Sequence, residues 1–167
     1  MPSLLTLLAS QPLRSLAPGD VLIAEGSPPG DLYVLEAGSL TVARAGIGVA
    51  TISQPGAVVG EMSVLLNKPH SATVRAESAA QVRVLSDASR ALDADPALAR
   101  QLATLLAARL DATTALLVEL SAQNEGPEQQ SLFDRILAAI HLPPIDADYL
   151  TVERHDLFGS NPEDERT

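Results

Sequence analysis

The residues best suited to chemistry lie in one stretch, residues 58–76, with the sequence VVGEMSVLLNKPHSATVRA. Gly60 and Glu61 precede an apolar helical turn at residues 62–66, and a polar segment at residues 69–73 leads into a strand. The first N–H groups of a helical turn have no intrahelical acceptors, and such groups bind anions. We therefore predict an anion site in this stretch, where a phosphate and a sugar are held together.

Other kinds of active site lack the residues that they need. The chain has no cysteine, and its three histidines, His70, His141 and His155, lie in separate segments without an H-x-H pair. Metal sites in small β-barrels gather histidines on neighbouring strands, and serine hydrolases place their nucleophile in a motif such as G-x-S-x-G. We therefore expect no catalytic residue, no metal and no cofactor, and we interpret the chain as a binding protein and not as an enzyme.

The composition narrows the class of partner. The 167 residues are 46% hydrophobic but only 2% aromatic, so their core is aliphatic, and the formal net charge is −10. An acidic chain without a basic cluster repels the phosphate backbone, which disfavours nucleic-acid binding but leaves room for a small anion held by local N–H groups. The lack of cysteine fits a reducing compartment, so we expect a cytoplasmic location. No apolar run approaches the length that a bilayer requires, so we expect no membrane span.

Short strands are expected through the first half of the chain. Glycines are concentrated between residues 19 and 60, and they separate β-prone runs that predict strands at residues 21–25, 32–37, 39–45, 48–53, 71–77 and 80–86. Turn residues at a spacing of roughly 8–12 are typical of an antiparallel sandwich or barrel. Before these strands, leucines at positions 4, 5 and 8 predict a packing helix over residues 2–14, ended by Pro12.

A long helix is expected after the strands. Asp95 and Pro96 form a favourable helix start, and no glycine lies between residues 87 and 123. One apolar stripe has the alternating spacing of a coiled-coil seam: Ala99, Ala103, Leu106, Leu110, Thr113, Leu117 and Leu120. A second stripe consists of Leu98, Leu102, Leu105 and Leu116. Packing on the chain's own sheet explains one stripe and packing on a second copy explains the other, and we expect both.

The last part of the chain is acidic. Residues 125–167 hold ten acidic and three basic residues. Gly126 and Pro127 break the long helix, and residues 132–140 predict a short amphipathic helix that prolines 143 and 144 end. We expect the end of the chain to be disordered. The chain thus divides into a domain at residues 1–123, with strands over about 18–86 and the long helix over about 96–123, and an acidic appendage at residues 124–167.

Three of these segments together resemble a known family. They are PGDVLIAEGSPPGDLYVLEAGSLTV at residues 18–42, GEMSVLLNKPHSATVRA at residues 60–76, and the long helix. Their order is similar to that in the cyclic nucleotide-binding domain of the catabolite activator (cAMP receptor protein) family, over about residues 3–123. The resemblance implies a mainly β fold with helices: an antiparallel β-roll of the jelly-roll type, a short N-terminal helix, and a long C-terminal helix that closes the pocket and forms a homodimer.

The resemblance also implies roles for single residues. Gly60 and Glu61 match the family's Gly-Glu pair, in which the acid accepts hydrogen bonds from the ribose 2′-hydroxyl. Ser71 matches the hydroxyl that contacts the cyclic phosphate, together with backbone N–H groups at residues 61–63. Residues 107–114, AARLDATT, resemble the helical segment whose hydroxyls recognise adenine across the dimer. The candidate ligand-binding residues are therefore Gly60, Glu61, Met62, Ser63, His70, Ser71, Thr113 and Thr114.

Two of these assignments have alternatives. Thr113 and Thr114 are also explained as polar residues that the seam tolerates. The family has arginine where this chain has His70, and histidine offers one donor and is mostly neutral near pH 7. Either a bound phosphate raises the pKa of His70 and binding is weaker and pH-sensitive, or the pocket is degenerate or selects another nucleotide. A milder departure is Val59, where the family usually has phenylalanine.

The part after the long helix also differs from the family. The activator continues into a helix-turn-helix domain, whereas here the short helix and the acidic appendage follow, so we expect no DNA reading. The leading hypothesis is a stand-alone, dimeric sensor of a cyclic nucleotide, cAMP before cGMP, that regulates a separate and unidentified protein effector. The alternative is a degenerate fold that binds no nucleotide and serves as a dimeric protein–protein interaction module.

Overall fold

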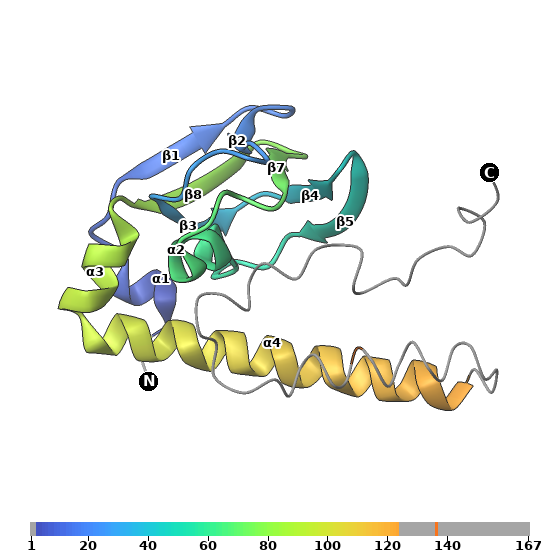
Figure 1. Cartoon of the computed structure of the whole chain (residues 1–167). Helices are drawn as coiled ribbons and strands as arrows, with labels where there is room; N and C mark the ends of the chain where they lie inside the picture. Colours follow the sequence, from blue (N-terminus) through green and yellow to red (C-terminus); the bar gives the residue numbers. More distant parts are fainter. Residues whose placement is uncertain (1–2, 124–135, 137–167) are drawn as a thin grey trace, which may run out of the picture. The chain divides into compact units, whose positions relative to one another are not determined.

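The computed structural model describes residues 3–123 and residue 136 (Figure 1). The chain divides into two compact units, Met1–Ala108 and Arg109–Thr167. The elements follow one another as α1 (Leu4–Leu7), β1 (Leu13–Leu16), β2 (Val21–Ile23), β3 (Leu32–Ala37), β4 (Leu40–Arg44), β5 (Ile47–Ile52), β6 (Val58–Val59), α2 (Glu61–Leu66), β7 (Thr73–Ala76), β8 (Ala80–Leu85), α3 (Ala88–Ala94) and α4 (Pro96–Gln123).

The strands form two four-stranded antiparallel sheets. One has the order β1-β8-β3-β6 and the other the order β2-β7-β4-β5. The crossing order arises because β7 pairs with both β2 and β4, and β8 pairs with both β1 and β3. Consecutive strands therefore alternate between the sheets in places, which is the arrangement of a jelly roll. The mainly β fold with a short N-terminal helix and a long C-terminal helix is as predicted.

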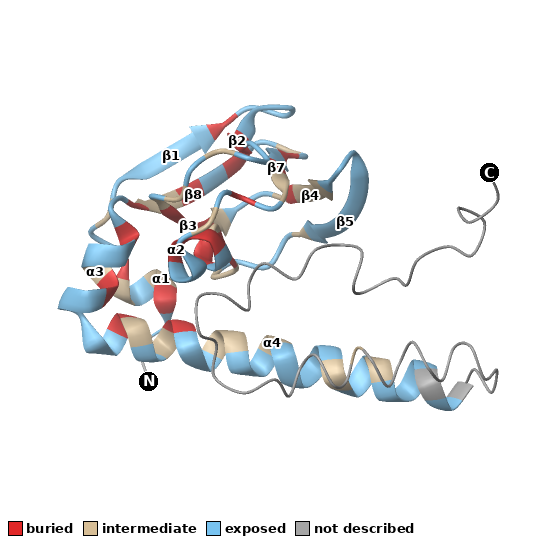
Figure 2. Ribbon diagram, in the orientation of Figure 1, coloured by how far each residue is buried: buried red, intermediate tan, exposed pale blue. Residues whose placement is uncertain are grey.

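Strand β3 is buried on both faces and connects two cores. Leu32 and Val34 belong to a cluster that contains residues of α1, α2, α3 and the start of α4. Tyr33 and Leu35 belong to the cluster between the sheets. Successive side chains of a strand point to opposite faces, so one apolar run serves both cores. Figure 2 shows the buried residues gathered on β3, β8 and the start of α4.

Most predicted strands are present within one or two residues of the expected bounds. The run at residues 32–37 is β3, and the run at residues 80–86 contains β8. The prediction of a helix over residues 2–14 was wrong in its extent: α1 covers only Leu4–Leu7, and Leu13–Leu16 is strand β1. Tertiary contacts determine that residues 13–16 form a strand, because all four residues of β1 pair with β8. Strand β6 and helix α3 were also missed, since both are short.

The start of α4 is as predicted. The Oδ1 atom of Asp95 accepts hydrogen bonds from the N–H groups of Ala97, at 2.9 Å, and Leu98, at 3.2 Å. Pro96, which has no N–H to satisfy, is the first helical residue. Leu98 and Leu102 are buried in the cluster next to β3, so the second apolar stripe packs on its own unit at this end.

The helix α4 corrects one expectation from the sequence. Its segment Pro96–Leu120, 25 residues with a mean hydropathy of 1.2, is long and apolar enough to cross a bilayer by length and composition alone. Few charged residues interrupt its leucines and alanines, which raises the mean above what the amphipathic pattern suggested. Within the described part of the chain this is the only such helix, and it is weak evidence, because core helices pass the same test.

The predicted short helix at residues 132–140 and the acidic end of the chain lie outside the described residues, apart from Ile136. The predicted domain boundary at residue 123 stays a prediction.

Candidate ligand-binding site

The predicted anion site is the connection from β6 through α2 to β7. Gly60 precedes α2 with a φ of 91°, a left-handed conformation that side chains strongly disfavour. A Cβ atom added here would lie 3.0 Å from the carbonyl oxygen of Asp31 and 3.6 Å from Cε1 of His70. The glycine is therefore required both by its backbone angle and by the close approach of the segment that leads into β3.

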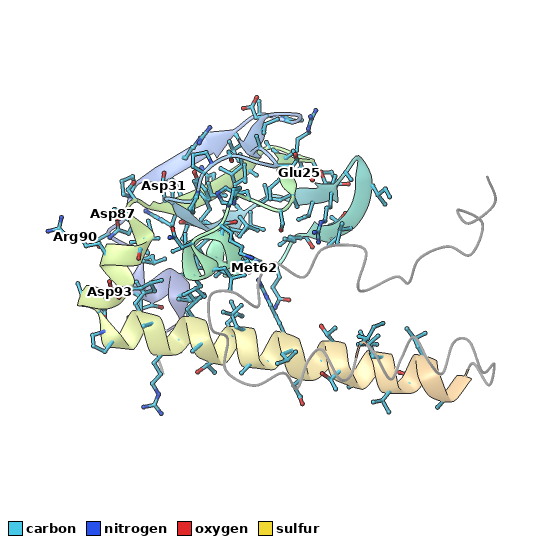
Figure 3. All side chains as sticks on the ribbon, in the orientation of Figure 1. Glu25, Asp31, Met62, Asp87, Arg90 and Asp93 are labelled. Carbon is cyan, nitrogen blue, oxygen red and sulfur yellow. The ribbon has the colours of Figure 1, made fainter. Side chains whose placement is uncertain are left out.

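One side of helix α2 is buried, at Glu61, Ser63 and Val64, and the other side is exposed, at Met62, Leu65 and Leu66. Glu61 and Ser63 are buried, at 5% and 6% exposure, whereas Met62 is 56% exposed and lies on the outer surface of α2 (Figure 3). The helix ends at Asn67, which is also left-handed, and the N–H of Lys68 donates to the carbonyl of Ser63 at 3.1 Å. The turn is thus closed at both ends by left-handed residues, which fixes the direction of its first N–H groups.

His70 is held in place through its backbone. Its N–H donates to the carbonyl of Ser27 at 2.8 Å, and its carbonyl accepts from the N–H of Gly26 at 2.7 Å. The residue is buried, at 9% exposure, and burial lowers the pKa of its imidazole below 6.5. His70 is therefore neutral at pH 7 in the ligand-free structure. The next residue, Ser71, is exposed.

A cavity of 420 Å³ opens beside His70. It is lined by strand β2, by the segment between β2 and β3, by the start of β3 and by His70: Val21, Leu22, Ile23, Ala24, Ser27, Pro28, Gly30, Asp31, Tyr33 and His70. Of the predicted ligand-binding residues, His70 alone lines this cavity within the described chain, and Gly60 adjoins it through the contact with Asp31 and His70. Four other predicted residues do not line the cavity and lie in the β6–α2–β7 connection: Glu61, Met62, Ser63 and Ser71.

Asp31 and Tyr33 were not predicted as site residues. The two side chains share a hydrogen bond, and the pKa of Tyr33 is raised above 10.0, by burial first and by the negative charge of Asp31 second. Arg14 acts on the phenol in the opposite direction. The sequence contains a signal for this, since a Gly-Asp pair directly before a mainly apolar strand places a carboxylate at the start of the strand.

Glu25 ties together three segments near the site. Its N–H donates to the hydroxyl of Thr73 at 3.1 Å, at the start of β7, and its Oε2 atom accepts from the N–H of Ala45 at 2.9 Å, in the turn between β4 and β5. These bonds link the β2–β3 segment to the start of β7 and to the turn between β4 and β5. They stabilise the backbone that carries His70 and Asp31.

Thr113 and Thr114 lie on α4 in the unit Arg109–Thr167. Their hydroxyls donate to the carbonyls of Arg109 and Leu110, each at 2.8 Å, as hydroxyls within helices commonly do. Each hydroxyl keeps its lone pairs as acceptors. Their predicted contact with a base stays a prediction. Within residues 3–123 and 136, no group of three or more acidic or histidine side chains could hold a metal ion.

The order of the strands, the left-handed Gly60 before the short helix α2, and the helices before and after the strands are typical of a β-roll binding domain. Comparison with known proteins agrees. Residues 13–90 match the family described as the cyclic nucleotide-binding domain. The N-terminal domain of a transcriptional regulator from Streptomyces coelicolor A3(2) is 31% identical, over 64% of this chain and 81% of that chain, with a TM-score of 0.51. The chain belongs to the cyclic nucleotide-binding domain family.

Two further solved structures share the fold. A cAMP-bound PfPKA-R chain (141-441) is 24% identical, over 66% of this chain and 37% of that chain, with a TM-score of 0.53. PKAR CBD2 bound to Sp-2Cl-cAMPS is 24% identical, over 70% of this chain and 76% of that chain, with a TM-score of 0.54. At this identity the two structures show a shared fold.

Proposed function

We propose that the chain is a sensor of a cyclic nucleotide, cAMP before cGMP, that regulates a separate protein in the cytoplasm and does not turn its ligand over. The observation that carries the proposal is the β6–α2–β7 connection, with left-handed Gly60 followed by buried Glu61 and Ser63. The assignment to the catabolite activator type and the action through a separate effector are part of this proposal.

Two groups of atoms in this connection contact different parts of the ligand. The buried Glu61 carboxylate accepts hydrogen bonds from ribose hydroxyls, and such bonds to a charged group are the strong ones. The N–H groups at residues 61–63, with the hydroxyl of Ser71, receive the phosphate. The neutral imidazole of His70 adds a donor but no charge until it is protonated.

In this proposal, the long helix transmits nucleotide binding to the separate effector. Thr113 and Thr114 meet the purine, and the seam of α4 joins two copies into a homodimer. A ligand biases the helix only by binding the closed arrangement more tightly than the open one.

Calorimetric titration of the full chain with cAMP and cGMP tests the proposal, with acyclic 5′-AMP as the control ligand. Glu61→Gln removes the charge without changing the shape, and it should weaken binding by about 10- to 100-fold, because a hydrogen bond to a charged group contributes about 1.5–3 kcal/mol. The matched control Glu77→Gln changes an exposed acid after β7 and should bind normally. Absence of heat at millimolar nucleotide would reject the proposal. Chromatography of the recovered nucleotide should show it unchanged.

A second function, a dimeric protein–protein interaction module without a nucleotide, is favoured by the buried, neutral histidine at the arginine position. In that case a partner bound by the chain would stay bound in Glu61→Ala, with or without nucleotide. The sensor proposal expects nucleotide control of the partner to be lost in this variant.

A further inference from the structure

The cavity beside His70 is only partly accounted for by the proposed nucleotide contacts. His70 belongs to both, but the other contacts come from residues 61–63, Ser71, Thr113 and Thr114, none of which lines the cavity. Its wall is formed instead by β2 and by the segment that leads into β3, where Figure 3 labels Asp31. A volume of 420 Å³ lies within the range of small-molecule sites.

The cavity has a negative wall. Among the described residues that line it, Asp31 is the one with a carboxyl side chain. Burial lowers the pKa of His70, which keeps the imidazole neutral, and burial with the charge of Asp31 raises the pKa of Tyr33, which keeps the phenol protonated. Arg14 lies outside the lining, and at the Tyr33 hydroxyl its charge has a smaller effect than that of Asp31.

The polar groups of the lining are mainly acceptors. Asp31 offers carboxylate oxygens as acceptors, and neutral His70 offers one ring nitrogen as an acceptor and the N–H of the other as a donor. The hydroxyl of Ser27 already donates to the carbonyl of Ala24 at 2.6 Å, so its lone pairs remain as acceptors. Leu22, Ile23 and Pro28 make up an apolar part of the wall. This combination suits a ligand that carries hydrogen-bond donors and positive charge on an apolar body.

The wall is formed before a ligand arrives. Ser27 is bonded to His70 and also donates from its N–H to the carbonyl of Ala24 at 3.1 Å. The carbonyl of Gly30 accepts from the N–H of Ala88 at 2.9 Å, which ties the segment to α3. A rigid site loses less free energy on binding, because few side chains have to be ordered.

We propose that this cavity binds a small organic cation, an amidinium or alkylammonium group on an apolar body, with Asp31 as its counter-ion. Cation and counter-ion form a charge-assisted hydrogen bond, which is stronger and more directional than one between neutral groups. The site shares His70 with the proposed nucleotide contacts, but its counter-ion Asp31 is not one of them, so it is expected whether or not the chain binds a cyclic nucleotide.

Two probes of equal shape and different charge test the proposal on the full chain. Benzamidinium and neutral benzamide are titrated separately into the ¹⁵N-labelled protein, and the backbone amide shifts of Ser27, Gly30 and His70 are followed by NMR. Benzamidinium should shift these amides with a dissociation constant at least about tenfold lower than that of benzamide. Equal affinities for the two probes, or no shift at these amides, would overturn the proposal.

Three variants locate the counter-ion. Asp31→Asn keeps the shape and an acceptor for Tyr33 but removes the charge, and it should weaken benzamidinium binding about tenfold. Asp93→Asn changes an exposed residue of α3, which lies apart from Asp31 in Figure 3. This variant should leave binding unchanged. His70→Arg places a cation on the cavity wall and should also weaken benzamidinium binding. Unaltered binding in Asp31→Asn would overturn the assignment, and if that variant does not fold, the probe pair and His70→Arg decide.

Discussion

At the scale of single residues, position 70 sets the charge of the site. His70 is buried, pinned to Ser27 and Gly26 through its backbone, and neutral because burial lowers its pKa. Asp31 lines the same cavity, and none of the described lining residues is a lysine or an arginine, so the cavity offers little positive charge to a phosphate. The same fact supports weak, proton-dependent nucleotide binding and an organic cation in the adjacent cavity.

His70→Arg should tighten cAMP binding by about 10- to 100-fold, because a permanent guanidinium makes a charge-assisted hydrogen bond with the phosphate. Isothermal titration at pH 7 measures the change. An unchanged affinity in the folded variant would mean that side chain 70 does not face the phosphate.

His70→Gln should make stability less sensitive to acid. The folded-state pKa of His70 lies below 6.5, so between that pKa and 6.5 the unfolded chain binds more protons than the folded one. The stability contributed by the neutral imidazole is full above pH 6.5 and is lost as the pH falls, by at most about 1.4 kcal/mol per pH unit. Urea denaturation of ligand-free protein across this window should give a shallower slope for the variant. Parallel curves for the two proteins would contradict the burial of a neutral histidine.

At the scale of elements, the site depends on the backbone that precedes α2. Gly60 must be left-handed, and the carbonyl of Asp31 approaches it closely, so the β2–β3 segment and α2 fix each other's positions. Glu25 adds bonds to β7 and to the β4–β5 turn. The ligand site and the roll are therefore stabilised by the same contacts.

Gly60→Ala should lower the free energy of unfolding by about 1–3 kcal/mol, because it places a side chain in a strained left-handed conformation against the Asp31 carbonyl. Gly48→Ala is the matched control, since a Cβ there meets nothing within 4 Å and its φ is not left-handed. Chemical denaturation of both variants measures the difference. Equal stabilities would show that α2 can move away from β3 at no cost.

At the scale of the whole molecule, the proposed dimer depends on the seam of α4. Leu110 is 49% exposed and Leu120 is 48% exposed, while Leu98 and Leu102 are buried in the unit Met1–Ala108. This burial agrees with packing of the first part of the second stripe on its own unit, whereas Leu116, farther along the same stripe, is 60% exposed. The seam's partner, and the dimer itself, stay predictions.

Leu110→Lys should convert a dimer into a monomer, because like charges would face each other in the seam. Light scattering should give about twice 17.4 kDa for the parent chain and about 17.4 kDa for the variant. Val118→Lys, an exposed position outside both stripes, should remain dimeric. A monomeric parent chain, or equal masses for the two variants, would reject the seam.

The sequence by itself determined the elements whose signals are local. Glycine-separated runs predicted β3, β4, β5, β7 and β8, and Asp95 with Pro96 predicted the start of α4, because turn and capping preferences depend on neighbouring residues. The resemblance at residues 60–76 led to the family. The segment at residues 13–16 was misread because its strand exists only through pairing with β8.

Only the tertiary structure decided what surrounds His70. Ser27, Asp31 and Tyr33 come to it from about forty residues away in the sequence, through backbone bonds between residues 26–27 and 70. No local pattern specifies such a contact, since the free energy that brings the segments together comes from the two cores on either side of β3. The sequence located the histidine, and the fold determined that it is buried, neutral and on the wall of a cavity that Asp31 also lines.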